Sequence, residues 1–268
     1  MEYLDFLKTK QVKIQKSGFD VEDKDLNPIL FDFQKYCVKK ALLAGKYALF
    51  EDCGLGKTLQ QLEWAKHVSE HTNKPVLILA PLGVIHQTIK EGAKFGYNVS
   101  EISLTVFDQD LKAGIYITNY DNLENIDAYL FGGVVLDESS ILKNFNGKTK
   151  QQLVDDFNET PYKLCCTATP SPNDTMELCN HAEFLNVMTR NEMLAMYFVH
   201  DGGNTSSWRL KGHAVRFFWD FVSTWAVMLT SPSDIGFDGS KYILPNLNIE
   251  EVFIETEKRD NGMLFNDI

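Results

Sequence analysis

The sequence predicts an α/β protein in which a central, mostly parallel sheet is flanked by helices. Short apolar segments alternate with segments of helical periodicity up to about residue 170, the usual pattern of strands joined by crossover helices. The composition, with 44% hydrophobic and 24% charged residues, is that of a globular protein and argues against a disordered, collagen-like or disulfide-stabilised chain. At 268 residues, the chain is long enough for one large or two small domains.

Short apolar segments predict the strands of the sheet, and amphipathic segments between them predict helices. Gln34–Ala44 and Thr58–Glu70 have helical periodicity, and Gly45 is placed to end the first of these helices. The predicted strands are Tyr47–Phe50, Val76–Ala80, Ile115–Thr118, Val134–Leu136 and Lys163–Cys166.

After about residue 180 the pattern changes, and we expect a C-terminal helical appendage with helices over Asn191–Val199 and Gly212–Leu229. Phe218, Phe221 and Trp225 recur at helical spacing, which favours a place in the core over base stacking. Alternation over Tyr242–Glu255 predicts an extended strand. We therefore divide the chain into an N-terminal extension (1–30), an α/β domain (31–180), the appendage (181–240) and a strand with a linker (241–268).

Charge and apolar content limit the partners of the chain. With 26 Lys and Arg against 37 Asp and Glu, its net charge is −11, which by itself counts against binding to nucleic acid or anionic membranes. Lysines interrupt the N-terminus, and no apolar segment approaches the roughly 18–20 residues of a membrane helix. We expect a soluble, cytoplasmic monomer with no membrane partner.

Cysteine spacing does not indicate a disulfide framework. The five cysteines have no regular spacing. Cys165, Cys166, Cys179 and His181 could in principle bind a metal ion, but adjacent cysteines in an apolar segment are more typical of a buried strand.

The segment from Tyr47 to Thr58 predicts a phosphate-binding loop between a strand and a helix. Gly54 and Gly56 allow backbone amides to approach phosphate oxygens, and the helix directs its positive end at them. Lys57 is then placed to contact the β- and γ-phosphates of ATP, and the Thr58 hydroxyl to bind Mg²⁺. Glu51 stands where the strict pattern has glycine. The predicted ATP-binding residues of this segment are Asp52, Cys53, Gly54, Leu55, Gly56, Lys57 and Thr58.

Two consecutive carboxylates follow the apolar segment Val134–Leu136. Acidic residues at strand ends also occur in surface turns, but after a phosphate-binding loop they indicate catalysis. We expect Asp137 to hold Mg²⁺ and Glu138 to act as general base, with Lys57 as the third catalytic residue.

Three segments together resemble the SNF2-type superfamily 2 helicases and translocases. Asp137 to Asn144 resembles the family's Asp-Glu-x-His-x-x-Lys-Asn, Glu51 to Thr58 its Asp-Glu-x-Gly-Leu-Gly-Lys-Thr, and Thr167 to Leu178 its Thr-Gly-Thr-Pro-x-x-Asn-x-x-x-Glu-Leu. The chain also looks like short helicase-like proteins of phages and prophages. The resemblance implies a RecA-like P-loop lobe over 31–180 that hydrolyses ATP with Mg²⁺ and moves on DNA, with double-stranded DNA favoured, in a bacterial or phage-infected cell.

Further roles follow from the resemblance. It implies that Gln34 reads the adenine edge and that Thr167, Thr169 and Ser140 couple hydrolysis to movement, although Ser140 replaces the family's histidine. It also implies a DNA-contacting set, Pro81, Leu82, Asn119, Tyr120, Lys143 and Asn144. Lys143, Lys148 and Lys150 form a basic group after the acidic pair that could bind DNA or be solvated surface charge.

The sequence contains no Gln-x-x-Gly-Arg-x-x-Arg segment, which in this family belongs to a second RecA-like lobe carrying arginine fingers. All four arginines lie at or beyond Arg190. We therefore expect that the second lobe is missing from this chain, that 241–268 leads towards it, and that the chain alone hydrolyses ATP weakly. Two alternatives remain open: an RNA or single-strand helicase, and a nucleotide-gated nucleic-acid binding module without translocation.

Overall fold

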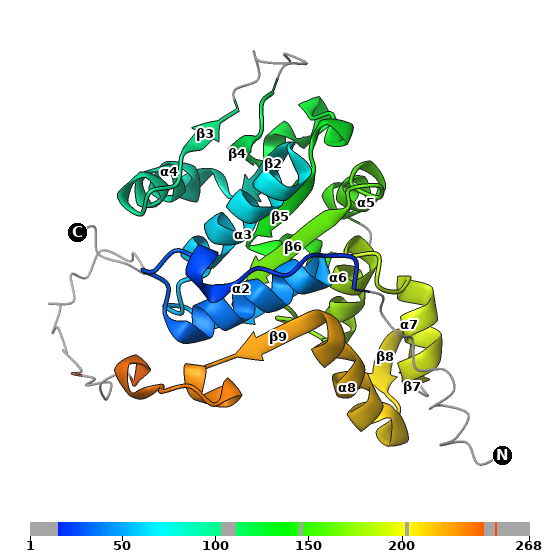
Figure 1. Cartoon of the computed structure of the whole chain (residues 1–268). Coiled ribbons are helices and arrows are strands. Elements are labelled where there is room, and N and C mark those ends of the chain that lie inside the picture. The colour runs from blue at the N-terminus through cyan, green and yellow to red at the C-terminus, as the bar shows by residue number, and fades with distance from the viewer. Residues whose placement is uncertain (1–15, 103–110, 145–146, 202–203, 244–249, 251–268) are drawn as a thin grey trace, which may run out of the picture.

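A seven-stranded, wholly parallel sheet forms the centre of the molecule (Figure 1). The computed structural model describes residues 16–102, 111–144, 147–201, 204–243 and 250. The strand order is β3-β4-β2-β5-β6-β1-β9. In chain order the strands are β1 (Lys46–Glu51), β2 (Pro75–Ala80), β3 (Val99–Glu101), β4 (Gly114–Asn119), β5 (Gly133–Asp137), β6 (Tyr162–Thr167) and β9 (Ala226–Leu229). The predicted α/β class and the five predicted strands are confirmed.

Helices cover both faces of this sheet, so its central strands β2, β5, β6 and β1 are buried from both sides. On one face lie α2 (Asp32–Ala44), α3 (Lys57–Thr72) and α4 (Ile85–Lys94); on the other lie α5 (Lys148–Asp156), α6 (Leu178–Phe184), α7 (Arg190–Tyr197) and α8 (Val215–Trp225). Alternate residues of β1 show the division: Leu49 belongs to the core under α2 and α3, and its neighbours Ala48 and Phe50 to the core on the opposite face.

Short 3-10 helices connect many of these elements. They span Asp23–Asp25, Leu82–Val84, Tyr120–Asn125, Ala128–Leu130, Ser139–Lys143, Thr175–Glu177, Gly212–Ala214, Pro232–Ile235 and Ser240–Tyr242. The one over Ser139–Lys143, called η5 below, directly follows the acidic pair.

The sheet order brings three functional segments to one edge. Strand β6 lies between β1 and β5, and the register pairs Phe50 with Thr167 and Asp137 with Cys166. The carboxyl ends of these parallel strands therefore lie side by side. The phosphate loop after β1, Thr167 at the end of β6 and the acidic pair after β5 meet there, where open α/β sheets bind their ligands.

The segment 181–240 contains more β structure than we expected. The helix predicted over Gly212–Leu229 ends at Trp225, and Ala226–Leu229 instead forms β9, which pairs with β1. The helix predicted over Asn191–Val199 ends at Tyr197, where β7 (Phe198–Asp201) begins and pairs antiparallel with β8 (Asn204–Leu210). Apolar residues that continue a helix and those that start a buried strand look alike in periodicity, and only the free edge of β1 distinguishes them.

Other predictions have mixed outcomes. Phe218, Phe221 and Trp225 are buried in the core, as predicted. The start of the strand predicted over Tyr242–Glu255 is the end of a 3-10 helix, and nearly all the rest lies outside the described residues. No helix in the described part is long and apolar enough to cross a membrane. The limits of the four predicted units stay a prediction.

Candidate nucleotide-binding site

The loop between β1 and α3 has the backbone of a phosphate-binding loop. Gly54 and Gly56 have φ values of 84° and 81°, which residues with a side chain rarely adopt. At Gly56 a Cβ atom would also lie 2.3 Å from Nε2 of Gln34, so a side chain cannot be accommodated there without movement. Helix α3 begins at Lys57 and turns its unpaired amides towards the loop, as anion sites at helix N-termini do.

Lys57 folds back over this loop. Its ammonium group donates hydrogen bonds to the backbone carbonyls of Glu51, at 2.8 Å, and Asp52, at 3.1 Å. Asp52, Cys53 and Gly54 are exposed, whereas Leu55 is buried and anchors the loop in the core. The lysine therefore lies over exposed backbone, where phosphate oxygens could become its partners.

Gln34, predicted to read the adenine edge, supports the loop in this structure. Its side chain is buried; Nε2 donates to the Leu55 carbonyl at 2.9 Å, and Oε1 accepts from the Phe31 amide at 3.0 Å. The amide therefore ties the start of α2 to the phosphate loop. Its contact with adenine stays a prediction.

Glu51, at the position of the expected glycine, places its carboxylate beneath the loop. The side chain is fully buried, and one oxygen accepts a hydrogen bond from Gln60 Nε2 of α3 at 2.6 Å. Burial raises the pKa of this carboxyl to about 7. The glutamate is tolerated because it points into the layer between the sheet and the helices.

The acidic pair occupies two different environments. Burial and the neighbouring Glu138 carboxylate raise the pKa of Asp137 to about 6, and Lys57 is close enough to lower it. Glu138 is exposed, and its backbone has left-handed values, φ 54° and ψ 54°. The structure therefore brings Lys57 and both carboxylates to one place, although they come from distant parts of the sequence.

Thr167, one of the predicted coupling residues, contacts the acidic pair, and Thr169, another, contacts Thr167. Oγ1 of Thr167 donates to Oε2 of Glu138 at 3.1 Å and accepts from the Thr169 amide at 3.1 Å. This chain of bonds links the base candidate to the segment after β6. The third predicted coupling residue, Ser140, is only partly exposed, but it is its neighbour Ser139 that contacts α6, with Oγ 3.2 Å from Nε2 of His181.

The side chains at this edge of the sheet fit Mg²⁺ and a nucleoside triphosphate. The Thr58 hydroxyl and Asp137 carboxylate are hard oxygen ligands of the kind Mg²⁺ prefers, and Mg²⁺ usually keeps several waters, so few protein ligands are needed. The effect of Lys57 on the pKa of Asp137 indicates that the phosphate-contacting and metal-binding groups are close together.

The predicted DNA contacts lie at the same sheet edge, and several have structural partners. Leu82 follows β2 and is 64% exposed, next to the half-buried Pro81. Asn119 accepts from the Asn122 amide through its side chain, and the Tyr120 hydroxyl donates to the Asp137 carbonyl at 2.7 Å. Lys143 and Asn144 are exposed at the end of η5.

The predicted basic group after the acidic pair has to be corrected at Lys150. Lys143 and Lys148 are exposed, but the Lys150 side chain is 2% exposed and forms an ion pair with Glu183 of α6. The amphipathic turn of α5 directs it inwards, and a buried ammonium needs such a partner. Lys150 is therefore not available to phosphates.

Cys165, Cys166 and Cys179 are buried, as expected for strand and helix residues of the core. Within the ranges the structure describes, no group of three His, Cys, Asp or Glu residues is arranged to hold a metal ion.

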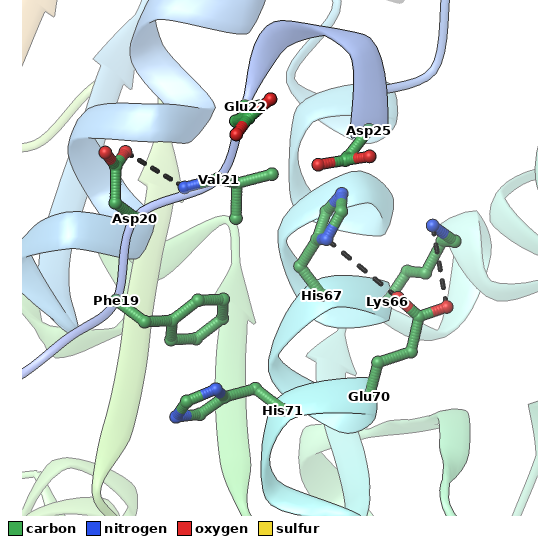
Figure 2. Close-up of a pocket in the computed structure, with 9 residues that line it drawn as sticks. All are labelled: Phe19, Asp20, Val21, Glu22, Asp25, Lys66, His67, Glu70 and His71. Atoms are coloured by element: carbon green, nitrogen blue, oxygen red, sulfur yellow. Dashed lines mark hydrogen bonds and ion pairs between the residues drawn. The ribbon is translucent and has the colours of Figure 1, made fainter.

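A separate cleft of about 630 Å³ lies at the other end of α3 (Figure 2). Phe19 stacks on His71 there at 3.9 Å, and Lys66 pairs with Glu70 at 3.5 Å. The carboxylates around it are those of Asp20, Glu22, Asp25 and Glu70. So many carboxylates repel phosphate, and this cleft is not a candidate for the nucleotide site.

Sequence reasoning missed Tyr120, Ser139, Asn180 and His181 as supports of the acidic pair. The motifs indicated only a DNA contact for Tyr120 and a possible metal ligand in His181, and no motif includes Asn180. The contacts of Ser139, Asn180 and His181 depend on how α6 packs beside η5, and that of Tyr120 on how the turn after β4 lies beside β5. Neither packing leaves a pattern in the sequence.

A parallel sheet with a phosphate loop after β1 and an acidic pair after β5 defines a P-loop nucleoside triphosphatase fold. Within this class, the chain belongs to the SNF2-related domain family, which matches residues 46–196, more than half of the chain.

Individual relatives agree with this family. Putative protein p41 of Acyrthosiphon pisum secondary endosymbiont phage 1 is 30% identical over 50% of this chain and 34% of its own length. The putative ATP-dependent helicase/translocase YwqA of Bacillus subtilis is 26% identical over 52% of this chain and 16% of its own length. The chain thus spans only about a third or less of these relatives.

Among solved structures, the Sulfolobus solfataricus SWI2/SNF2 ATPase core in complex with dsDNA has a TM-score of 0.62 at 21% identity. The match covers 78% of this chain and 46% of that one. The similarity shows the same fold, the RecA-like fold predicted from the motifs.

Proposed function

We propose that this chain is the ATP-binding lobe of an SNF2-type ATP-dependent DNA translocase or helicase. The observation that supports this best is the meeting of Lys57, Asp137 and Glu138 at one sheet edge in a chain of the SNF2-related domain family. The same edge contains the loop backbone that can receive phosphates, which makes nucleotide binding the simplest use of the site.

In this proposal the loop amides and Lys57 bind the β- and γ-phosphates, and the Thr58 hydroxyl and Asp137 carboxylate hold Mg²⁺. The metal ion, when bound, neutralises phosphate charge. Glu138 accepts a proton from the attacking water while the water oxygen bonds to the γ-phosphorus and the bond to the bridging oxygen breaks. ADP and inorganic phosphate are the products.

Thr167 is then the link between hydrolysis and movement. Its hydroxyl senses the Glu138 carboxylate through the 3.1 Å hydrogen bond and its neighbour Thr169 continues the chain of contacts. A change in charge or position at Glu138 therefore reaches the segment after β6 directly.

Nucleic acid would cross the sheet edge formed by the ends of β2 and β4 and by η5. Exposed Leu82, Lys143 and Asn144 lie there, and the structural neighbour with the same fold was determined with dsDNA. The net charge of −11 does not exclude this, because Asp137 and Glu138 act on Mg·ATP and the exposed lysines lie beside them. Double-stranded DNA is the favoured partner.

Turnover by this chain alone should be slow. The sequence contains no Gln-x-x-Gly-Arg-x-x-Arg segment, and arginine fingers supply about 10³–10⁵ in rate in related ATPases. Rapid hydrolysis by these 268 residues would contradict this assignment.

Two substitutions test the proposal. Lys57→Ala should weaken ATP binding, because it removes the phosphate-contacting ammonium, whereas Glu138→Gln should bind ATP as the parent does and lose at least about a hundredfold in hydrolysis rate. A fluorescent ATP analogue measures affinity, and single-turnover assays measure rate with no DNA, single-stranded DNA, double-stranded DNA and RNA. Normal turnover by Glu138→Gln would exclude this base, and stimulation by RNA or single strands alone would favour the alternative helicase.

A further inference from the structure

The backbone at Glu138 is held in an unusual conformation by its neighbours. Its φ and ψ of 54° lie in the left-handed region, which a glutamate rarely adopts. Such strained residues persist only where the surrounding structure holds them. The contacts on both sides of Glu138 should therefore show what maintains it.

The residue before Glu138 is held through its carbonyl and the residue after it through its side chain. The Tyr120 hydroxyl donates to the Asp137 carbonyl at 2.7 Å, from the turn that follows β4. Ser139 is fully buried, and its Oγ lies 3.2 Å from Nε2 of His181 in α6. Both contacts act within one residue of the catalytic carboxylate.

Helix α6 is itself well placed to hold this segment. His181 is fully buried, and its Nδ1 lies 3.4 Å from the Glu177 carbonyl, which can only accept. In the tautomer that donates to Glu177, Nδ1 carries the proton and Nε2 accepts from the Ser139 hydroxyl. The next residue back, Asn180, donates to the carbonyls of Leu142, at 2.8 Å, and Lys143, at 3.3 Å. Two adjacent side chains of α6 thus contact both ends of η5.

We propose that Tyr120 and His181 are positioning residues that keep Glu138 in its left-handed conformation and so direct its carboxylate at the attacking water. This inference rests on the proposed role of Glu138 as general base. Neither residue touches the phosphate loop in the described contacts, so they should affect the rate of hydrolysis and leave nucleotide affinity unchanged.

The Ser139 and His181 pair allows positioning to be separated from stability. His181→Leu removes the imidazole partner of the buried Ser139 hydroxyl, which also contacts the Cys165 thiol, and should lower the melting temperature. Ser139→Ala with His181→Leu removes both polar side chains and should restore part of the loss. If the pair positions Glu138, the double variant remains at least about tenfold slower in single-turnover hydrolysis, with ATP affinity within about twofold of the parent. His181→Gln, whose side-chain oxygen can accept from Ser139, should retain most of the rate.

A matched control is Ser69→Ala, which removes another buried hydroxyl, donating to the Lys74 carbonyl at 2.8 Å far along α3. It should lower stability without changing the rate. Tyr120→Phe, which keeps the ring and removes the hydroxyl, should slow hydrolysis, as the double variant does.

The outcomes separate this inference from the proposed function. If the parent does not bind Mg·ATP, or Glu138→Gln hydrolyses ATP normally, the proposed function is wrong. If Glu138→Gln is inactive but the double variant hydrolyses at the parental rate, only the positioning role is wrong. A crystal structure of the double variant decides the point without turnover, because a positive φ retained at residue 138 would overturn the proposal.

Discussion

At the scale of single residues, buried carboxylates explain features that the motif pattern alone could not. Glu51 occupies a glycine position without blocking the loop, because its side chain turns into the core and accepts from Gln60. Asp137 is partly buried beside Glu138, and its pKa is raised to about 6. A sequence motif does not specify where a side chain points. The burial of these two carboxylates is therefore known only from the structure.

Glu51 predicts a pH dependence of stability. Its pKa is raised by burial to about 7, above the ordinary value of 4.5, so the folded protein binds a proton that the unfolded chain releases between these values. Its contribution to stability is present below about pH 4.5 and is lost as the pH rises towards 7. Glu51→Gln should therefore stabilise the protein at pH 7 to 8 by about 1–3 kcal/mol.

Urea unfolding of the parent and Glu51→Gln between pH 4.5 and 8 measures this effect. The difference in free energy of unfolding should grow with pH and level off above about 7. A difference that is constant with pH would show that Glu51 titrates normally. Asp52→Asn, an exposed neighbour, is the control and should not change the profile.

At the scale of elements, the ion pair between Lys150 and Glu183 joins α5 to α6. Helix α6 also binds η5, the segment that follows the acidic pair. The ion pair therefore helps to fix the helix that holds this segment in place. Lys150, which the sequence left as either a DNA contact or solvated surface charge, is thus part of the packing beside the site.

Removing Lys150 should destabilise the protein. Lys150→Ala leaves the partly buried Glu183 without its charge partner and should lower the free energy of unfolding by about 2 kcal/mol, less than for a fully buried pair because Glu183 is 23% exposed. Lys148→Ala, exposed on the same helix, should change it by no more than about 0.5 kcal/mol. Thermal and urea unfolding measure both, and equal effects would contradict the inward placement of Lys150.

At the scale of the whole molecule, the proposed function requires a surface that can bind nucleic acid. The sheet edge with Leu82, Lys143 and Asn144 is the candidate, and the exposed Lys148 extends it. Because the chain has a net charge of −11, binding would depend on this local group of lysines, and on salt.

Neutralising Lys143 and Lys148 together tests this surface. The double change to Gln should weaken DNA binding and reduce the slope of log affinity against log salt by up to about 2, since each phosphate contact contributes roughly 0.9. Fluorescence anisotropy with a duplex at several salt concentrations measures the slope. Lys66→Gln, on the acidic cleft of Figure 2, is the control, and an unchanged slope in the test variant would place DNA elsewhere.

The sequence by itself determined the α/β class, the five main strands, the phosphate loop and the acidic pair, because these depend on local periodicity and on contiguous motifs. Gly54, Gly56, Lys57 and Asp137 could be predicted as site residues from neighbouring residues alone. Tertiary structure decided the rest: that residues 226–229 form a seventh strand, that Lys150 points inwards, and that His181 reaches Ser139. Each of these is a contact between residues distant in sequence, and such contacts depend on how the layers pack, which no local pattern encodes.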